Sequence, residues 1–370
     1  MSQDIRDAIG HCLQESLTFA AFRAPGQPVT LWAQRDPDLD HVEPGLLWEL
    51  NDAFVMAPFM HQGERLPIIR ADVELTFGDL PVFQDHLHAC TGQRTNFPAP
   101  TGSTTREAYE QLVSEAIAAI GRGELEKVVL SRISVEPLDR AALAELFVQA
   151  LDAGPDSLVA LMHTPDHGTW LGASPERLVL AEEDLARLDA LAGTCPIKEA
   201  PDSPEEWGPK ERHEQVLVTR SIVEGLLDMG LKDIHITGPE VVDAGPVAHL
   251  LTRIDADMTG HSLDEVVFAV HPTPAVCGRP RQKARAFIAD HEPQDRGLYT
   301  GFWGPWRADG RTELFVNIRC LQALSDSAVL HIGAGITAGS EPAREWEETA
   351  RKAEVWLKAL EAARLASPPA

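Results

Sequence analysis

The chain has 370 residues, of which 44% are apolar and 24% charged, a composition typical of a globular protein with one large domain or two. Its formal net charge of −25 argues against binding to nucleic acid or an anionic membrane, because no basic patch offsets the repulsion. No stretch approaches the roughly 20 apolar residues of a membrane-spanning helix, and residues 1–17 lack the apolar core of a signal peptide, so a cytoplasmic protein is expected.

The first hundred residues mix short apolar runs with proline and glycine, and residues 97–103 have the composition of a linker. Beyond the linker, apolar periodicity and β-branched content predict helices and strands in clusters. Helices are expected at 104–120, 141–151, 210–229 and 340–364, and strands at 127–135, 158–162, 177–180, 234–237, 265–270, 299–304, 313–321 and 328–332. Ser340 is expected to be the N-cap of the last helix. The clusters lack strict alternation of strand and helix, which favours an α+β fold with antiparallel sheet.

Two of the predicted helices each carry an E-x-x-E pair. Glu211 and Glu214 continue the apolar stripe of one helix, so these carboxylates should point inward. Glu345 and Glu348 gather with Lys352 on one face of the last helix, where a solvated ion pair is the alternative. Inward carboxylates need a partner, because an unpaired buried charge is very costly. Two such helices could hold a hard cation with oxygen ligands and retained waters, as Mg²⁺ prefers.

A glycine-rich turn at 333–337 is expected between a strand and the last helix. The exposed N–H groups of Gly333 and Gly335 could form an anion-binding nest, although a tight connection alone would explain the glycines. Arg319 ends the preceding strand and can bind a carboxylate in bidentate fashion, and Lys352 would add another cationic contact. Together these residues predict a pocket for carboxylates beside a metal ion.

Lys127 and Glu176 are a candidate acid–base pair. Lys127 begins an otherwise apolar strand, where burial would favour the neutral amine that can act as a base. Glu176 follows a turn at the entrance of another strand. His271 begins a loop that two prolines and a glycine constrain, and a capping or core role is its alternative. The residues alone do not place Lys127 and Glu176 opposite each other.

These segments, in this order, resemble the chorismate-utilising enzymes, the family of isochorismate, salicylate, anthranilate and aminodeoxychorismate synthases. The resemblance covers residues 104–362, whereas 1–103 matches only as the variable N-terminal part of the same fold and 363–370 is expected to be a tail. The matching blocks are E-K-V-V-L-S-R (126–132), G-A-S-P-E-R (172–177), L-A-G-T (191–194), K-E-R-H-E (210–214), H-P-T-P-A-V-C-G (271–278), D-R-G-L-Y-T-G (295–301), N-I-R (317–319), G-A-G-I (333–336) and E-W-E-E-T-A-R-K (345–352).

The resemblance implies two stacked, largely antiparallel sheets flanked by helices, with the active site in the cleft between them. It implies Mg²⁺ as cofactor, with Glu214 and Glu348 as direct ligands and Glu211 and Glu345 acting through water. It also implies a set of residues that bind chorismate: Gly193, Thr194, His271, Thr273, Ala275, Tyr299, Ile318, Arg319, Gly333, Gly335 and Lys352. Because members of the family are often monomeric, a monomer is expected.

Individual positions favour isochorismate synthase within the family. Lys127 stands where isochorismate and salicylate synthases carry the lysine that activates water, and Glu176 resembles the acid that protonates the departing 4-hydroxyl. Ala192 replaces the nucleophilic lysine of aminodeoxychorismate synthases, and the H-P-T-P form around His271 is the isochorismate-synthase version of that loop. Tyr299 leaves pyruvate elimination open, so salicylate synthase is the alternative activity. A catalytically inactive chorismate-binding subunit is a further alternative.

Two substitutions depart from the family pattern. Gln215 replaces the histidine that commonly follows Glu214, and Glu211 replaces an aspartate. Both lie in the outer shell of the predicted site, where a change should tune a metal rather than abolish its binding.

Overall fold

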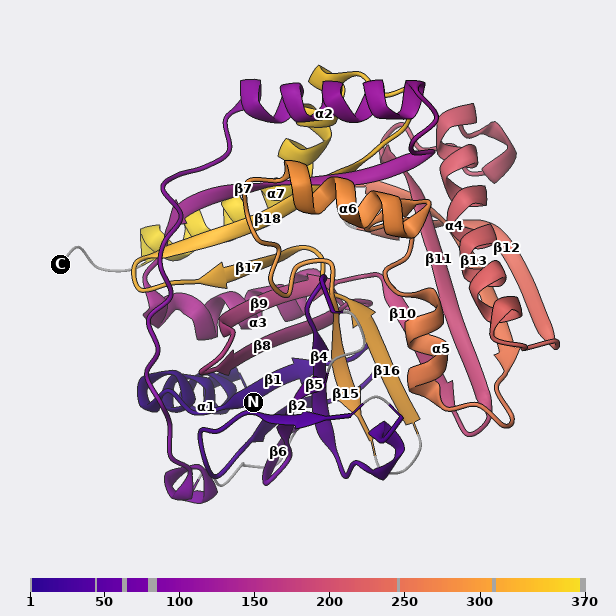
Figure 1. Ribbon diagram of the computed structural model, residues 1–370. Helices are drawn as coiled ribbons and strands as arrows, with labels where there is room; N and C mark the ends of the chain where they lie inside the picture. The colour runs from indigo at the N-terminus through magenta and orange to yellow at the C-terminus, as the bar shows by residue number, and fades with distance from the viewer. Residues whose placement is uncertain are drawn as a thin grey trace.

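Two antiparallel nine-stranded sheets form the centre of the computed structural model, which describes residues 2–43, 45–61, 65–78, 85–244, 247–307 and 311–366 (Figure 1). The first sheet contains, in spatial order, β14 (Gly278–Arg279), β7 (Lys127–Pro137), β18 (Ser327–Ile336), β17 (Cys320–Ala323), β9 (Gly168–Ser174), β8 (Leu158–Thr164), β1 (Phe19–Arg23), β2 (Val29–Ala33) and β6 (Val73–Phe77). The second contains β12 (Ile234–Ala244), β13 (Val247–Asp257), β11 (Leu185–Pro196), β10 (Arg177–Glu182), β16 (Arg311–Val316), β15 (Phe302–Trp306), β4 (Ala53–Ala57), β5 (Leu66–Arg70) and β3 (Asp40–Val42). Every neighbouring pair is antiparallel, which confirms the predicted fold class.

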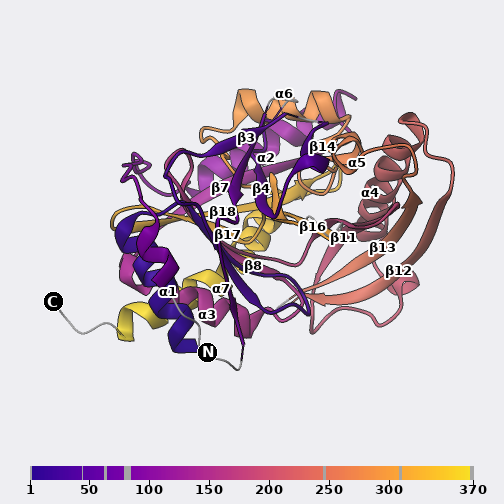
Figure 2. The same cartoon turned by 90° about the horizontal axis from the view of Figure 1, so that it is seen from below.

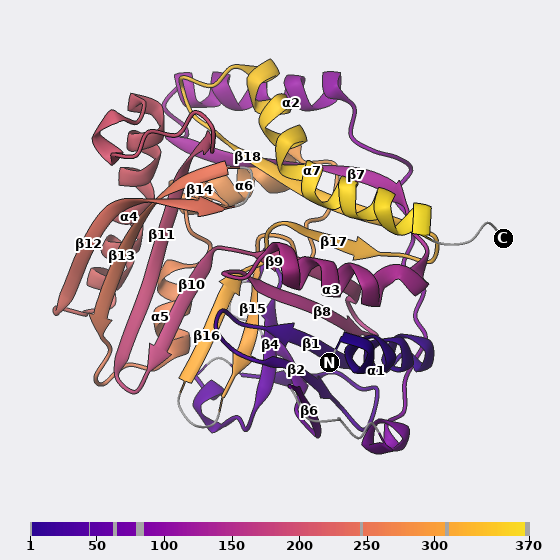
Figure 3. The same ribbon diagram turned by 180° about the vertical axis from the view of Figure 1, so that it is seen from behind.

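Helices cover the outer faces of both sheets. They are α1 (Ser2–Glu15), α2 (Arg106–Gly121), α3 (Leu143–Ala153), α4 (Pro209–Asp228), α5 (Leu263–Val270), α6 (Arg281–His291) and α7 (Pro342–Ala366), with 3-10 turns at Leu47–Glu49, Asp85–Ala89, Arg140–Ala142 and Pro204–Glu206. The helices α1, α3 and α7 pack on one face of the first sheet (Figure 3). The helices α4 and α5 pack on the second sheet, and Figure 2 shows α4 far from α1 and α3. None of the described helices has the length and apolar content needed to cross a bilayer.

A third apolar cluster joins the inner faces of the two sheets. Phe22 and Trp32 of the first sheet pack there with Phe54, Trp303 and Phe315 of the second, and all five side chains are buried. The ring pairs meet edge-on or tilted, with Phe22 and Trp32 4.8 Å apart between centroids, a favourable arrangement for aromatic rings. This cluster fixes the distance between the sheets and therefore the width of the cleft beside it.

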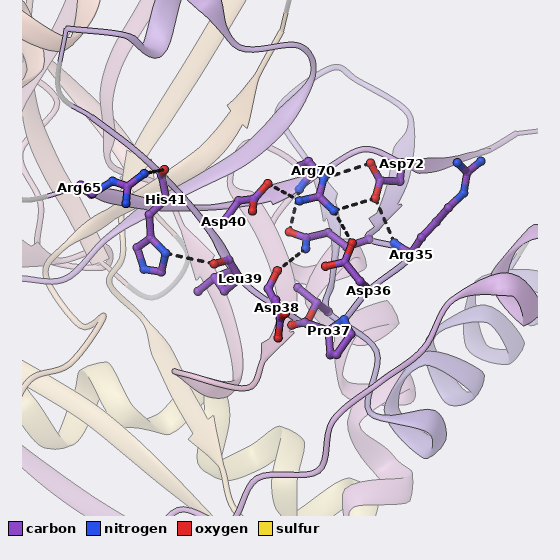
Figure 4. A network of polar contacts seen from close by, with 12 residues as sticks. Arg35, Asp36, Pro37, Asp38, Leu39, Asp40, His41, Arg65, Arg70 and Asp72 are labelled. Carbon is purple, nitrogen blue, oxygen red and sulfur yellow. Dashed lines mark hydrogen bonds and ion pairs between the residues drawn. The ribbon is translucent and has the colours of Figure 1, made fainter.

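The N-terminal hundred residues supply strands to both sheets, and a network around Arg70 joins them (Figure 4). Arg70, at the end of β5, contacts the carboxylates of Asp36, Asp40 and Asp72. Its backbone N–H donates to Gln34 Oε1 over 3.1 Å, directly after β2 of the other sheet. The pKa of Asp72 lies below its usual value, because contacts with Arg70 and the Arg35 amide outweigh burial. The network therefore ties the end of a first-sheet strand to a second-sheet strand.

Two of the points at which the chain crosses between the sheets lie next to each other. Between β9 and β10 it crosses at Pro175 and Glu176, and between β16 and β17 it returns through residues 317–319. The two crossings are bonded to each other, because the Val316 N–H donates to Glu176 O over 3.0 Å and the Ala173 N–H to Arg319 O over 3.1 Å. The predicted single strand at 313–321 is therefore wrong. Arg319 has φ +50°, a turn that redirects the chain into the other sheet.

Several other sequence predictions are wrong in type or boundary. The strand predicted at 299–304 is β15, which begins only at Phe302. The strand predicted at 265–270 is the helix α5, whose buried residues follow a helical spacing and whose N-cap Ser262 forms a capping box with Glu265. The glycine-rich turn predicted at 333–337 is the end of β18, paired with β7 up to residue 336. The last helix begins at Pro342 rather than after Ser340, and it ends at Ala366, two residues beyond the predicted helix end and inside the predicted tail at 363–370. Residues 367–370 lie outside the described part of the chain.

Candidate active site

A cavity lies between the sheets, where the two crossings face the first turns of α4 and the middle of α7. Fourteen of the seventeen predicted site residues line it: Lys127, Glu176, Gly193, Thr194, Glu211, Glu214, Ala275, Tyr299, Ile318, Arg319, Gly333, Gly335, Glu348 and Lys352. Segments that are far apart in the sequence are therefore brought to one place, including the two E-x-x-E helices. The cavity lies in the cleft between the sheets, where the expected architecture places the active site.

Lys127 is a buried lysine at the start of β7. Its side chain is 2% exposed, and its Nζ lies 2.8 Å from Glu214 Oε1 on α4. Gly335 of β18 leaves the space for this ion pair, because a Cβ there would overlap the Glu214 carboxylate and lie 2.9 Å from Lys127 Cε. Glycine at this position therefore serves the side chains opposite rather than a turn.

Glu176 is a buried acid on the first crossing, with only 6% of the residue exposed. Burial raises its pKa to about 7, although the positive charges of Lys127, Lys352 and Arg319 act in the opposite direction. A carboxyl with this pKa carries its proton through much of the neutral range, so it can donate that proton to a leaving group.

Arg319 lies on the second crossing with its backbone in the left-handed region. Such a conformation is costly for a residue with a Cβ and persists where neighbouring contacts impose it. Here the Arg319 carbonyl accepts hydrogen bonds from Trp356 Nε1 over 2.8 Å and from the Ala173 N–H over 3.1 Å. The guanidinium that these bonds hold in the cavity has the planar donor arrangement suited to a carboxylate.

Three of the four glutamates predicted as metal ligands contact lysines. The pairs are Glu214–Lys127 at 2.8 Å, Glu345–Lys210 at 2.9 Å and Glu348–Lys352 at 2.8 Å. Lys352 also donates to Gly333 O over 3.0 Å. Burial and the nearby Glu348 charge raise the pKa of Glu345, whereas Lys352 outweighs burial at Glu348 and lowers its pKa. Carboxylates of α4 and α7 are thus concentrated around ammonium groups.

The chemistry of these side chains fits a hard divalent cation. All four predicted ligands supply carboxylate oxygens, the donors that Mg²⁺ prefers. In the described part of the chain, no three metal-ligating side chains stand close enough together to hold an ion as they are, since lysines occupy three of the carboxylates. The ligand type and charge fit Mg²⁺, and side-chain rearrangement would be needed to bind it.

His271, Thr273 and Glu345 do not line the cavity. His271 is buried, and its Nε2 donates to Thr300 O over 3.1 Å, so it supports the turn that carries Tyr299. The Thr273 carbonyl accepts from the Val276 and Cys277 N–H groups, which closes the loop before β14. Glu345 lies behind the cavity wall with its side chain 2% exposed. The predicted substrate contacts of His271 and Thr273 are therefore not supported by their positions, which are in the loops beside the cavity.

Lys210 and His249 line the cavity but were missed as site residues. His249 contacts Gly193 O and Thr194 Oγ1 through Nδ1, at 3.1 and 3.3 Å. Burial, followed by the Arg319 and Lys352 charges, lowers its pKa to about 3, so the ring is neutral. A histidine inside the apolar run Val247–Leu251 was the available signal. Lys210 adjoins Glu211, but its burial depends on Glu345 of a distant helix.

Comparison with known proteins gives a consistent result. The family model described as chorismate binding enzyme matches residues 83–361. The isochorismate synthase MenF of Haemophilus influenzae is 32% identical over 89% of this chain and 76% of its own length, and the isochorismate synthase DhbC of Bacillus subtilis is 33% identical over 69% and 68%. The solved structure of a 2,3-dihydroxybenzoate-specific isochorismate synthase, DhbC from Bacillus anthracis, superposes with a TM-score of 0.76 at 24% identity, covering 98% of this chain and all of that one.

Proposed function

This chain belongs to the family of chorismate-binding enzymes, and on that basis we propose that it is an isochorismate synthase that interconverts chorismate and isochorismate. The observation that carries the proposal is the placement of Lys127 and Glu176, both buried, in one cavity with Arg319. The reaction needs a base for the incoming water and an acid for the departing hydroxyl.

The proton transfers follow from this pair. Lys127, as the neutral amine, accepts a proton from water while the water oxygen bonds to C2 of the ring. The ring double bond shifts, and the C4–O bond breaks as Glu176 gives its proton to the departing hydroxyl, which leaves as water. Lys127 ends protonated and Glu176 ionised, the reverse of their starting states, so the same two groups serve the back reaction.

The substrate carboxylates require positive charge. Arg319 and Lys352 would hold the enolpyruvyl carboxylate beside Gly333 and Gly335. We propose Mg²⁺ for the ring carboxylate, with Glu214 and Glu348 as direct ligands and Glu211 and Glu345 acting through water. When bound, Mg²⁺ would supply positive charge to that carboxylate. Glu214, as its ligand, would no longer pair with Lys127, so the ammonium group could release its proton to solvent and then act as a base.

Product analysis with purified protein, chorismate and Mg²⁺ tests the proposal. The expected product is isochorismate, and turnover should fall by a factor of about 10²–10⁴ in Lys127→Ala and in Glu176→Gln, because each variant removes one proton-transfer group. Lys358→Ala is the matched control, since Lys358 is an exposed lysine on α7 that pairs only with Glu354 among the described contacts. Full activity of either active-site variant would refute the assigned roles.

A pyruvate assay in the same reactions separates the proposed activity from salicylate synthesis. An isochorismate synthase releases no pyruvate, whereas a salicylate synthase releases one pyruvate for each aromatic product. Absence of any chorismate turnover would instead support a binding subunit without catalysis.

A further inference from the structure

His331 is a buried histidine whose ring has no partner. It is 6% exposed, and neither Nδ1 nor Nε2 has a hydrogen-bond partner among the residues that the structure describes. A buried polar group left without a partner costs about 1–3 kcal/mol, so its retention in a packed core needs a reason. A bound ligand that supplies the missing hydrogen-bond partner would be such a reason.

The position of His331 on β18 directs it toward the cavity. Side chains two residues apart on a strand share a face, and His331 therefore lies on the same face as Gly333 and Gly335. Gly333 faces Tyr299, because a Cβ there would lie 2.7 Å from Tyr299 Oη. His331 itself is among the residues that line the cavity.

Two aromatic rings hold the imidazole in a fixed plane. Trp170 stacks on the His331 ring, with centroids 5.2 Å apart and planes inclined by 26°. Tyr299 also stacks on it, with a centroid distance of 5.4 Å and an interplanar angle of 24°. Trp170 is itself fixed by a 2.8 Å hydrogen bond from Nε1 to His167 O. Imidazole nitrogens form hydrogen bonds at the ring edge, so these stacking contacts leave both nitrogens available to a ligand.

The imidazole is neutral. Burial, with a smaller contribution from the Arg296 charge, lowers the pKa of His331 to about 3. A neutral imidazole offers one N–H donor and one acceptor nitrogen. It can therefore donate a hydrogen bond to a carboxylate without placing another charge in the cavity.

We propose that His331 is a substrate-binding residue that donates a hydrogen bond from its ring edge to a carboxylate oxygen of the bound dicarboxylate, at the end of the cavity formed by Tyr299 and Gly333. This inference rests on the proposed function for the identity of the substrate. The stacked rings position the donor before binding, and the bond satisfies a nitrogen that is otherwise buried without a partner.

The variants His331→Phe and His331→Gln test the proposal, with KM, kcat and thermal unfolding of the substrate-free protein as readouts. His331→Phe keeps a flat ring that can stack with Trp170 and Tyr299 but removes the donor. KM for chorismate should rise about tenfold or more, with a smaller change in kcat. Substrate-free stability should be unchanged or higher, because an unsatisfied polar group is removed. His331→Gln restores a donor and should recover part of the affinity.

The control is His163→Phe, a buried histidine of β8 that bonds to Thr169 and does not line the cavity. It should leave KM unchanged. An unchanged KM in His331→Phe, or a loss of stability with no change in KM, would overturn the proposal for His331 alone, provided that the unmodified protein converts chorismate. If the unmodified protein neither binds nor converts chorismate, the proposed function fails instead.

Discussion

At the scale of single residues, the pKa of Glu176 gives the sharpest expectation. Its raised value of about 7 means that the free enzyme loses its proton donor as the pH rises through this value. We expect kcat/KM for the formation of isochorismate to fall tenfold per pH unit on the alkaline side of about pH 7. The measurement is a pH profile at saturating Mg²⁺. A profile that stays flat to pH 9 would remove Glu176 from the role of acid.

The same pKa has a consequence for stability that does not depend on activity. Folded Glu176 keeps its proton to about pH 7, whereas in the unfolded chain the side chain has its ordinary pKa of 4.5 and loses the proton there. Stability contributed by the protonated side chain is therefore present below about pH 4.5 and lost as the pH rises through 7. The free energy of unfolding should thus fall across this window relative to that of Glu176→Gln, whose side chain does not titrate.

At the scale of elements, the glycines of β18 show how a strand can make space for a site. Gly335→Ala would push only the ends of the Glu214 and Lys127 side chains, whereas a Cβ at Gly333 would also lie 2.9 Å from the Leu130 backbone carbonyl. We expect Gly335→Ala to lose activity about 10²-fold with little change in melting temperature, since displacement of about 1 Å in an active site can have that effect. Gly339→Ala, with open space around it, is the control. Full activity of Gly335→Ala would contradict the proposed role of the Lys127–Glu214 region.

Local patterns predicted several of the helices and strands after residue 103, but they predicted no element before it, missed β9, β11 and β13, and failed where the chain changes sheets. The helices α2 and α4 and the strand β7 were recognisable because the apolar residues of each recur at a consistent spacing and a terminating residue marks its end. The break between β16 and β17 was not recognisable, since its cause is the left-handed turn at Arg319, which hydrogen bonds from Ala173 and Trp356 support. The helix α5 was mistaken for a strand because its apolar residues are β-branched, although its capping box was visible in the sequence.

The candidate site also contains some residues that local patterns could predict and others that they could not. The E-x-x-E pairs, Arg319 and Lys127 could be predicted because their residue types stand out against an apolar pattern or match a family motif. Lys210 pairs with Glu345, which is 135 residues away, and His331 gains its significance from Trp170 and Tyr299 on other elements. Contacts of this range depend on the packing of both sheets, so one local segment could not reveal them.

At the scale of the whole molecule, a strongly acidic protein contains an almost neutral cavity. The chain carries a net charge of −25, yet the cavity is lined by four cationic side chains, Lys127, Lys210, Lys352 and Arg319, and by the carboxylates of Glu211, Glu214 and Glu348. Glu345, outside the cavity lining, pairs with Lys210. His249 and His331 are neutral, and Glu176 keeps its proton below about pH 7. A dicarboxylate entering this cavity therefore brings two negative charges that the protein itself does not balance.

Transfer of uncompensated charge into a buried site is costly, so binding of chorismate and of Mg²⁺ should be coupled. The variant Glu176→Gln is suited to the measurement, because it should bind chorismate without turning it over. We expect calorimetric titration to give an Mg²⁺ affinity at least about tenfold higher with saturating chorismate than without it. Because linkage is reciprocal, Mg²⁺ should raise the affinity for chorismate by the same factor. Equal Mg²⁺ affinities in the two titrations would show that the cavity does not rely on the cation to balance its substrate.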